Sequence, residues 1–301
     1  MELGYPKRIY IMAFDHRGSF KKLFGLSGAL SPEDQARVED GKRLIFEGLR
    51  QAITEGADRD HAGVLVDEEF GAAVARQARE EAVPLAMPVE KSGQDEFDFE
   101  YREDFPAHIE SFDPSFSKVL VRANPEGDKE MNDRQFARLR RLSDWLHDHD
   151  RRFLFELLVP ATQSQLDDAG GSAARYDTEV RPTLMQRTIE EIQDAGIEPD
   201  VWKIEGIDST AACAEIAALV KRDGRDGVGC IVLGRGADDA AVEGWLRAGA
   251  AVPGYQGFAI GRSIFNASVK GVATGTMERP EATRLISEKY RHFVDVYEGR
   301  E

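Results

Sequence analysis

Cysteine is nearly absent from this 301-residue chain, which contains only Cys213 and Cys230. Each lies in an apolar stretch, so we expect two buried thiols rather than a disulfide or a metal pair, and no redox chemistry is implied. Histidine is also scarce, and the only close pair, His147 and His149, lies in a polar run. Residues two apart on a helix point to different faces, so this pair does not indicate a zinc site.

The chain also lacks an excess of positive charge and long apolar segments. Its 55 Asp and Glu residues outnumber 39 Lys and Arg, which leaves a formal net charge of −16. A strongly negative field disfavours binding to nucleic acid and to anionic membrane surfaces. No apolar run approaches the roughly 20 residues that span a bilayer, and the N-terminus lacks the apolar core of a signal peptide. We therefore expect a cytoplasmic protein that concentrates positive charge locally wherever it binds a small anion.

What the sequence does contain is a regular alternation of short β-rich apolar runs with longer amphipathic segments. We expect strands at Arg8–Phe14, Gly63–Asp67, Leu85–Glu90, Ser117–Arg122, Phe153–Val159, Val201–Glu205, Gly229–Leu233 and Gly257–Ile260. We expect helices over residues 32–55, 132–147, 179–195, 210–220 and 282–297, the first of them capped by Ser31 with Pro32 at its first position. Eight such units predict an α/β protein with one domain over residues 1–301, a single (β/α)8 TIM barrel, and a doubly wound open sheet is the alternative. The polar loop 91–103 is interpreted as an active-site lid or an interface segment.

A lysine lies inside the sixth apolar run. In a barrel the active site forms at the C-terminal ends of the strands, and Lys203 is followed by Glu205, which should share its face. Burial disfavours the ammonium form and favours the neutral amine, which can attack a ketone to form a Schiff base. The alternative is an interior ion pair that only fills the barrel. Lys91 and Lys118 are weaker candidates. Lys91 begins a polar loop, and we expect Lys118, at the start of its strand, on the stability face at the N-terminal end of the barrel.

A carboxylate occupies the middle of the fifth run, where an unpaired charge would be costly. Glu156 is flanked on both sides by apolar residues, so it needs a partner, and the lysine of the next strand is the natural one. A carboxylate beside a Schiff-base lysine can move protons during carbinolamine formation and bond cleavage. A purely structural pairing with Lys203 remains open from spacing alone.

Two Gly-Arg turns follow the seventh and eighth runs. They are Gly234-Arg235-Gly236 and Gly261-Arg262. Barrels commonly build a phosphate site at these strand ends from backbone N–H groups and a helix N-terminus. Glycine lets the backbone approach the ligand and arginine can contact two phosphate oxygens, so the pair of turns predicts a phosphate site.

Metal-assisted chemistry is the main alternative that these residues leave open. Asp15, Asp67, Glu69 and Glu90 could converge on a divalent ion such as Mg²⁺, which favours oxygen ligands. His and Cys do not cluster in the sequence, so we expect no catalytic transition metal.

Six segments together resemble a known family. They are Ile11–Phe20, Ala86–Tyr101, Phe153–Pro160, Val201–Gly206, Gly229–Gly236 and Gly257–Phe265. They resemble the aldolase-like domain attached C-terminally to the sugar kinase of bacterial inositol catabolism, that is, the aldolase-like part of 5-dehydro-2-deoxygluconokinase fusions. The likeness spans nearly the whole chain. More distantly, the segments are similar to class I tagatose-bisphosphate and sulfofructose-phosphate aldolases, which are (β/α)8 barrels.

The resemblance implies a role for individual residues. Lys203 matches the Schiff-base lysine, Glu156 the glutamate that assists proton transfer, and Asp15 the acid of the first-strand motif, which here continues with His16 where that motif usually has Gln. The residues that it implies for binding substrate and phosphate are Gly234, Arg235, Gly236, Gly261, Arg262, His16, Arg17, Arg122 and Glu205. Supportive positions are Asp67, Glu69, Glu90 and Lys91.

The implied activity is cleavage of a phosphorylated keto sugar or keto sugar acid, for example 5-dehydro-2-deoxygluconate 6-phosphate, to dihydroxyacetone phosphate and an aldehyde. The implied mechanism needs the lysine and neither a metal nor a cofactor. Alternatives are a sulfofructose-phosphate or tagatose-bisphosphate aldolase, a barrel that binds a sugar phosphate without turnover, and a metal-assisted lyase or isomerase. We expect homo-oligomers, and we expect no sugar phosphorylation, since the chain begins directly with its first strand.

Overall fold

Eight parallel strands form a closed barrel in the computed structural model, which describes residues 2–300. The strands are β1 (Ile9–Ala13), β2 (Ala62–Leu65), β3 (Leu85–Pro88), β4 (Phe116–Arg122), β5 (Arg152–Leu158), β6 (Val201–Glu205), β7 (Gly229–Leu233) and β8 (Tyr255–Ile260). Each strand pairs with the next, and β8 closes the ring on β1. The predicted TIM barrel is confirmed, and all eight predicted runs form strands.

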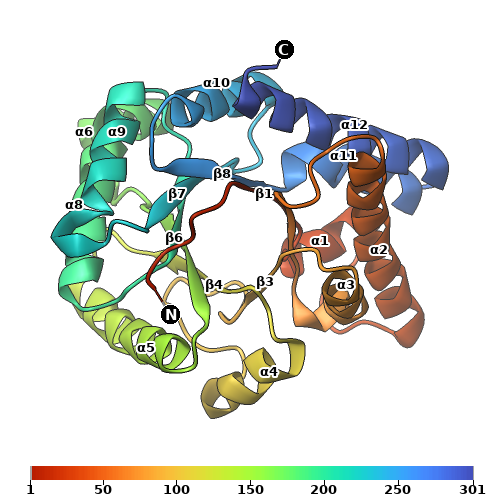
Figure 1. Ribbon diagram of the computed structural model, residues 1–301, viewed down its shortest axis with the longest axis horizontal. Coiled ribbons are helices and arrows are strands. Elements are labelled where there is room, and N and C mark those ends of the chain that lie inside the picture. The colour runs from red at the N-terminus through yellow and green to blue at the C-terminus, as the bar shows by residue number, and fades with distance from the viewer. Residues whose placement is uncertain (1, 301) are drawn as a thin grey trace.

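Helices surround the ring of strands on the outside (Figure 1). The α-helices are α1 (Gly18–Lys21), α2 (Pro32–Thr54), α3 (Glu68–Glu80), α4 (Phe105–Phe112), α5 (Lys129–Asp148), α6 (Gln163–Asp168), α7 (Ala173–Arg175), α8 (Arg181–Asp194), α9 (Thr210–Leu219), α10 (Asp239–Ala250), α11 (Arg262–Ala273) and α12 (Arg279–Glu298). Short 3-10 turns lie at Lys22–Phe24, Arg102–Asp104 and Arg222–Gly224, and a π-helical turn lies at Tyr176–Val180.

Two predicted helix starts were wrong. The helix expected from residue 132 begins at Lys129, because the Asp128 side chain accepts a hydrogen bond from the Met131 N–H and caps it there. The last helix begins at Arg279 rather than at 282, with Pro280 in its first turn, where a missing N–H costs nothing. Neither shift moves a residue of the site.

The interior of the barrel is built in layers, because alternate residues of a strand point inward. A cluster of buried apolar side chains fills the layer nearest the N-terminal ends of the strands, and on β4, β5 and β6 it consists of Phe116, Leu154 and Val201. The next inward residues on these strands are therefore two positions further on. Glu156 and Lys203 are such residues, and they stand opposite each other in the register of β5 and β6.

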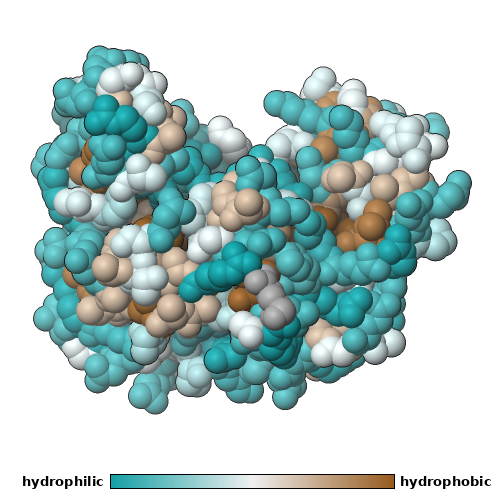
Figure 2. Space-filling view, turned by 90° about the horizontal axis from the view of Figure 1, so that it is seen from above, coloured by the Kyte–Doolittle hydropathy of each residue, from teal (hydrophilic) through white to brown (hydrophobic). Residues whose placement is uncertain are grey.

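The two ends of the barrel differ. The N-terminal segment crosses the opening in front of the strands in Figure 1. There the Gly4 N–H donates to the buried Asp200 carboxylate at 2.8 Å and the Tyr5 N–H donates to the Gly227 carbonyl at 3.1 Å. Figure 2 shows a notch between two raised walls at its upper edge, which is the side facing away from the viewer in Figure 1. Access to the interior is therefore from the end opposite the N-terminal segment.

Three further expectations concern segments outside the barrel interior. Cys213 and Cys230 are free and buried, as predicted. The loop 91–103, interpreted as a lid or an interface segment, is anchored by the buried Phe97 and Phe99 and by an isolated antiparallel bridge between Glu90 and Phe99. Among the helices of residues 2–300, none is long and apolar enough to cross a membrane.

Candidate active site

A two-lobed cavity occupies the C-terminal end of the barrel. The first lobe, about 560 Å³, is lined mainly by residues of β5 to β8 and the loops that follow these strands. The second lobe, about 530 Å³, lies toward the loops after β1 and β3. Six residues line both lobes, namely His16, Ser19, Leu120, Arg122, Glu156 and Lys203. The predicted lysine and glutamate therefore lie where the two lobes meet.

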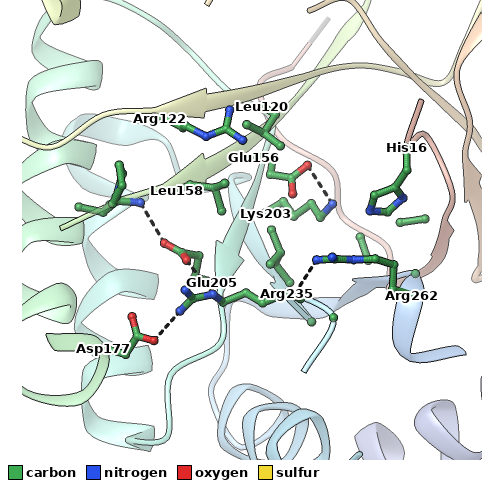
Figure 3. A pocket seen from close by; sticks show the side chains of 18 of the residues that line it. His16, Leu120, Arg122, Glu156, Leu158, Asp177, Lys203, Glu205, Arg235 and Arg262 are labelled. Carbon is green, nitrogen blue, oxygen red and sulfur yellow. Dashed lines mark hydrogen bonds and ion pairs between the residues drawn. The ribbon is translucent and has the colours of Figure 1, made fainter. Parts of the chain in front are cut away.

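A chain of alternating lysines and carboxylates lies at this junction. The Nζ atom of Lys203 is 2.9 Å from Oε2 of Glu156, and the same oxygen is 3.0 Å from Nζ of Lys118. Lys118 also contacts Asp15 at 2.8 Å and Glu90 at 2.7 Å. Figure 3 shows the Lys203 ammonium directed at Glu156, with His16 on the other side of the lysine. The structure thus brings together the three residues predicted to be catalytic.

The expectation for Lys118 was wrong. It is the next inward residue after Phe116 on β4 and pairs with Leu154 in the register of β4 and β5, two positions before Glu156. Its side chain is 1% exposed, and its ammonium group lies at the centre of the cluster rather than on the stability face. A residue near the start of a strand reached the site because a lysine side chain is long enough to extend along the barrel axis.

The charges of this cluster fix its protonation. Burial opposes ionisation of Asp15, but the Lys118 ammonium outweighs it and holds the pKa of Asp15 well below its usual value. Burial likewise opposes ionisation of Glu156, whose pKa is nevertheless lowered by Lys118 and Lys203. Burial also acts against the ammonium form of Lys118, yet Asp15, Glu156 and Glu90 raise its pKa well above the ordinary value. For Glu90 burial dominates and the pKa is raised.

The segment after β1 carries His16 and Arg17 beside Asp15. Burial lowers the pKa of His16 to about 4, although Asp15 acts in the opposite direction, so the imidazole is neutral at pH 7. Within residues 2–300 its Nδ1 atom has no hydrogen-bond partner. Arg17 donates to the Glu90 carbonyl and to Glu100, each at 2.7 Å, and so ties this segment to the one after β3.

The two Gly-Arg turns lie side by side in the first lobe, but their arginines differ. Arg235 is paired with Asp177 at 2.8 Å and with Glu205 at 3.2 Å. Arg262 forms no ion pair within residues 2–300, and it donates to the carbonyl of Arg235 at 2.7 Å. Figure 3 shows both side chains at the same end of the lobe. The carboxylate of Glu205, which was predicted to contact substrate, is thus paired with Arg235 and accepts a hydrogen bond from the Val159 N–H at 2.9 Å.

Glycine is required at two points of these turns. Gly236 has φ +72°, and a Cβ there would lie 2.7 Å from the Arg262 guanidinium. A Cβ at Gly261 would lie 2.0 Å from the Ala13 carbonyl oxygen. Gly261 precedes α11 and supplies no side-chain cap, so N–H groups of the first turn of that helix remain available to a ligand.

The second lobe carries positive charge that the protein does not neutralise. Lys21, Lys22, Lys91 and Arg122 line it, and none of the four forms an ion pair with any residue of 2–300. Arg122 donates to the Gln94 carbonyl at 2.9 Å. The acidic side chains of this lobe are already engaged, either by Lys118 or, for Glu96, by Arg134 and Arg138. In a chain with net charge −16, this is a local concentration of free cations.

The carboxylates considered as magnesium ligands do not surround a common point. Asp15 and Glu90 bind Lys118, whereas Asp67 binds Lys42 at 2.6 Å. Glu69 is exposed in the first turn of α3 and lines neither lobe. Within residues 2–300 there is no group of three or more His, Cys, Asp or Glu side chains that could hold a metal ion.

Sequence reasoning missed three residues of the site or its surroundings. Lys118 was placed on the wrong face, although its position two residues before an inward Leu120 was a usable signal. Lys42 lies on an amphipathic helix, where a lysine is ordinarily solvated, and nothing in the local pattern marks it as buried. Asp177, which holds Arg235, belongs to the π-helical turn, which has no sequence signature of its own.

The chain matches one protein family over nearly its whole length. Residues 4–301 match a family described as "Uncharacterized protein conserved in bacteria (DUF2090)". The chain belongs to this family. Among curated proteins nothing matches.

Several solved structures share the fold of this DUF2090 protein. A fructose-bisphosphate aldolase from Plasmodium falciparum is 14% identical, with a TM-score of 0.65 over 96% of this chain and 90% of the other. An archaeal fructose 1,6-bisphosphate aldolase is 15% identical, with a TM-score of 0.57 over 98% and 95% of the two chains. A further archaeal fructose-1,6-bisphosphate aldolase was solved with its catalytic Lys covalently bound to the carbinolamine intermediate, and it matches at 15% identity and a TM-score of 0.55 over 97% and 94%. At these identities the likeness is one of fold.

Proposed function

We propose that the chain is a class I aldolase, an aldehyde-lyase in which Lys203 forms a Schiff base with the ketone of a phosphorylated keto sugar or keto sugar acid. The observation that carries the proposal is the contact of 2.9 Å between Lys203 and Glu156 at the junction of two lobes. A lysine in the middle of the cavity can reach a ketone in the middle of a substrate, with one end of the substrate in each lobe. The aldolases with the same fold, one of them solved with a carbinolamine on its lysine, add support.

Lys203 is a better nucleophile than Lys118. Lys118 contacts three carboxylates, which hold its proton, and its side chain is 1% exposed. Lys203 contacts one carboxylate, at the boundary of both lobes. Only a neutral amine attacks a carbonyl carbon, so we assign the nucleophile to the lysine that contacts fewer carboxylates.

The reaction then follows from the positions of the acids. The neutral Lys203 amine adds to the ketone carbon, and Glu156 supplies the proton with which the carbinolamine oxygen leaves as water. A carboxylate, for which Asp15 is the candidate, removes the proton of the hydroxyl group β to the iminium carbon. The C–C bond breaks, its electron pair moves into the iminium to give an enamine, and an aldehyde forms. Protonation of the enamine carbon and addition of water release dihydroxyacetone phosphate and restore Lys203.

The two lobes suggest where the ends of the substrate bind. In the first lobe the phosphate would contact Arg262, Gly236 and the N-terminus of α11, where free N–H groups and the helix dipole favour an anion. In the second lobe a carboxylate would contact Lys22, Lys91 and Arg122. This arrangement favours a keto sugar acid phosphate, and we name 5-dehydro-2-deoxygluconate 6-phosphate, an intermediate of inositol catabolism, as the first substrate to test. Sulfofructose phosphate and tagatose bisphosphate also carry a second anion and are the alternatives.

Reductive trapping tests the proposal. The protein is incubated with dihydroxyacetone phosphate and borohydride, its intact mass is measured, and the modified peptide is mapped. We expect one adduct, on the Lys203 peptide, and none in K203R, which keeps the charge but cannot form the imine. An adduct on the Lys118 peptide would refute the assignment of the nucleophile. Binding of the phosphate without any adduct would refute the aldolase and leave a barrel that binds sugar phosphates. Release of dihydroxyacetone phosphate from the three named substrates then identifies the aldehyde half.

A further inference from the structure

A third buried lysine lies just outside the cavity, behind the segment that carries Asp15. Lys42 belongs to α2, and both its side chain and that of Asp67 are 0% exposed. The Lys42 ammonium donates to the Phe14 carbonyl, to the His16 carbonyl at 2.8 Å and to the Asp67 carboxylate at 2.6 Å. An ammonium group has three N–H bonds, so these three acceptors satisfy it completely.

The two carbonyls lie on either side of Asp15. One belongs to the peptide group that precedes Asp15, and the other to the peptide group that follows His16. Fixing both peptide groups fixes the backbone direction between them, and therefore the direction in which the Asp15 carboxylate and the His16 ring leave the chain. At the C-terminal end of the barrel, the Asp15 carboxylate lies 2.8 Å from the Lys118 ammonium group.

Asp67 holds Lys42 from the other side. One of its oxygens binds the lysine, and the other accepts a hydrogen bond from the Phe70 N–H at 2.9 Å, which caps α3. Asp67 thus connects Lys42 to the end of β2 and to the start of α3. The ammonium also lies 4.4 Å from the centre of the Phe20 ring, so it is enclosed on the remaining side.

Stability alone does not account for this pair. Removing two charges from water is costly, and well-packed apolar replacements for a buried ion pair are often neutral or stabilising. Here the pair links α2 to the residues that directly follow β1 and β2. What it holds is a segment of irregular backbone that carries two groups of the cavity.

We propose that Lys42 and Asp67 are positioning residues that orient Asp15 and His16 toward the reacting centre. The inference rests on the proposed aldolase function. In that reaction Asp15 acts only if its carboxylate lies within hydrogen-bonding reach of a substrate hydroxyl, and small misplacements of such groups cost large factors in rate. Lys42 itself touches neither lobe, so it acts through the backbone.

The test is K42M/D67N, which removes both charges while the side-chain oxygen of the introduced asparagine can still cap α3. The first assay measures the rate at which dihydroxyacetone phosphate and cyanoborohydride trap Lys203, at several concentrations of dihydroxyacetone phosphate and several pH values. The second assay measures the turnover number as the release of dihydroxyacetone phosphate from the best substrate. We expect the turnover number to fall about 10- to 100-fold. We expect the concentration of dihydroxyacetone phosphate that gives half-maximal trapping to stay within about threefold, because the phosphate site is untouched. K42Q, whose amide still donates two hydrogen bonds, should keep more activity than the double variant.

D200N is the matched control. Asp200 is equally buried and also accepts backbone N–H groups, but at the closed end of the barrel. It should lower the thermal midpoint without changing turnover at temperatures where the protein is folded. K42M/D67N with wild-type turnover, or with a loss no larger than that of D200N at equal midpoint, would overturn the positioning role. So would a loss confined to weaker phosphate binding. Absence of an adduct in the wild-type chain would instead overturn the proposed function and this inference with it.

Discussion

Removing the central ammonium group of the cluster tests the electrostatics of the site most directly. In K118M the carboxylates Asp15, Glu90 and Glu156 lose the cation that lies 2.7–3.0 Å from each of them. At 2.8 Å and an effective dielectric constant of about 20, each attraction amounts to about 6 kcal/mol before desolvation is subtracted. Breaking a buried pair by removing one partner costs about 3–5 kcal/mol in practice. We therefore expect K118M to lose about 3–5 kcal/mol of unfolding free energy at pH 7.5.

The loss should depend on pH with a definite sign. In the native chain the pKa values of Asp15 and Glu156 are lowered, so these groups contribute stability above their unfolded pKa values, and that contribution is lost as pH falls through the folded values. In K118M burial still raises both pKa values and Asp15 also raises that of Glu156, while Lys203 and, for Asp15, His16 remain to oppose them. Without Lys118 both pKa values therefore rise. The folded variant then takes up protons that the unfolded chain releases above about pH 4, and its stability decreases as pH rises.

Urea denaturation of both proteins at pH 5.0 and pH 7.5 measures this difference. We expect a destabilisation at pH 7.5 that exceeds the one at pH 5.0 by at least about 1.4 kcal/mol, which is the free energy of a tenfold change in one protonation equilibrium. K129M, at an exposed pair on the surface of α5, is the control and should cost less than about 0.5 kcal/mol at either pH. A destabilisation by K118M that is below about 1 kcal/mol, or that does not change with pH, would refute the reasoning.

Four further variants test the remaining parts of the site. E156Q should slow reductive trapping by about 10²- to 10⁴-fold with little change in phosphate affinity, and an unchanged trapping rate would remove Glu156 from proton transfer. R262A should weaken dihydroxyacetone phosphate binding by about tenfold or more, and R235A by less, because Arg235 is already neutralised; calorimetry that gives the reverse order would contradict the assignment of the phosphate site. K22Q/K91Q should raise the KM for a keto sugar acid phosphate by about tenfold and leave trapping by dihydroxyacetone phosphate unchanged, whereas equal effects on both would show that the second lobe does not bind the far anion.

The barrel and half of the site could be predicted from the sequence. Short apolar runs rich in β-branched and aromatic residues define strands wherever both faces are buried, so all eight were found. Lys203 and Glu156 were conspicuous because a charge in the middle of an apolar run needs a partner. The role of Lys118 was less visible, because the strand alternation indicates an inward side chain but not how far its ammonium group extends along the barrel axis.

The sequence did not indicate which charged side chains would pair with each other. Both Gly-Arg turns look alike as residues, yet one arginine is held by Asp177, from a π-helical turn far earlier in the chain, and the other has no ion pair within residues 2–300. Lys42 is similar, since its burial results from the packing of α2 over the segment after β1. These distinctions depend on contacts between segments that are distant in the sequence, and local sequence patterns do not specify such contacts.

The division of the cavity has a consequence for the use of this chain as a catalyst. Under the proposed chemistry the bond that breaks lies at the junction, so the ketone half stays attached to Lys203 while the aldehyde half departs from the second lobe. Under the same proposal, the two halves contact separate sets of side chains on separate loops. In the synthetic direction, replacing Lys22 or Lys91 would change which aldehydes are accepted without altering the donor, and the barrel would serve as a carboligation scaffold whose acceptor scope is set by the loops after β1 and β3.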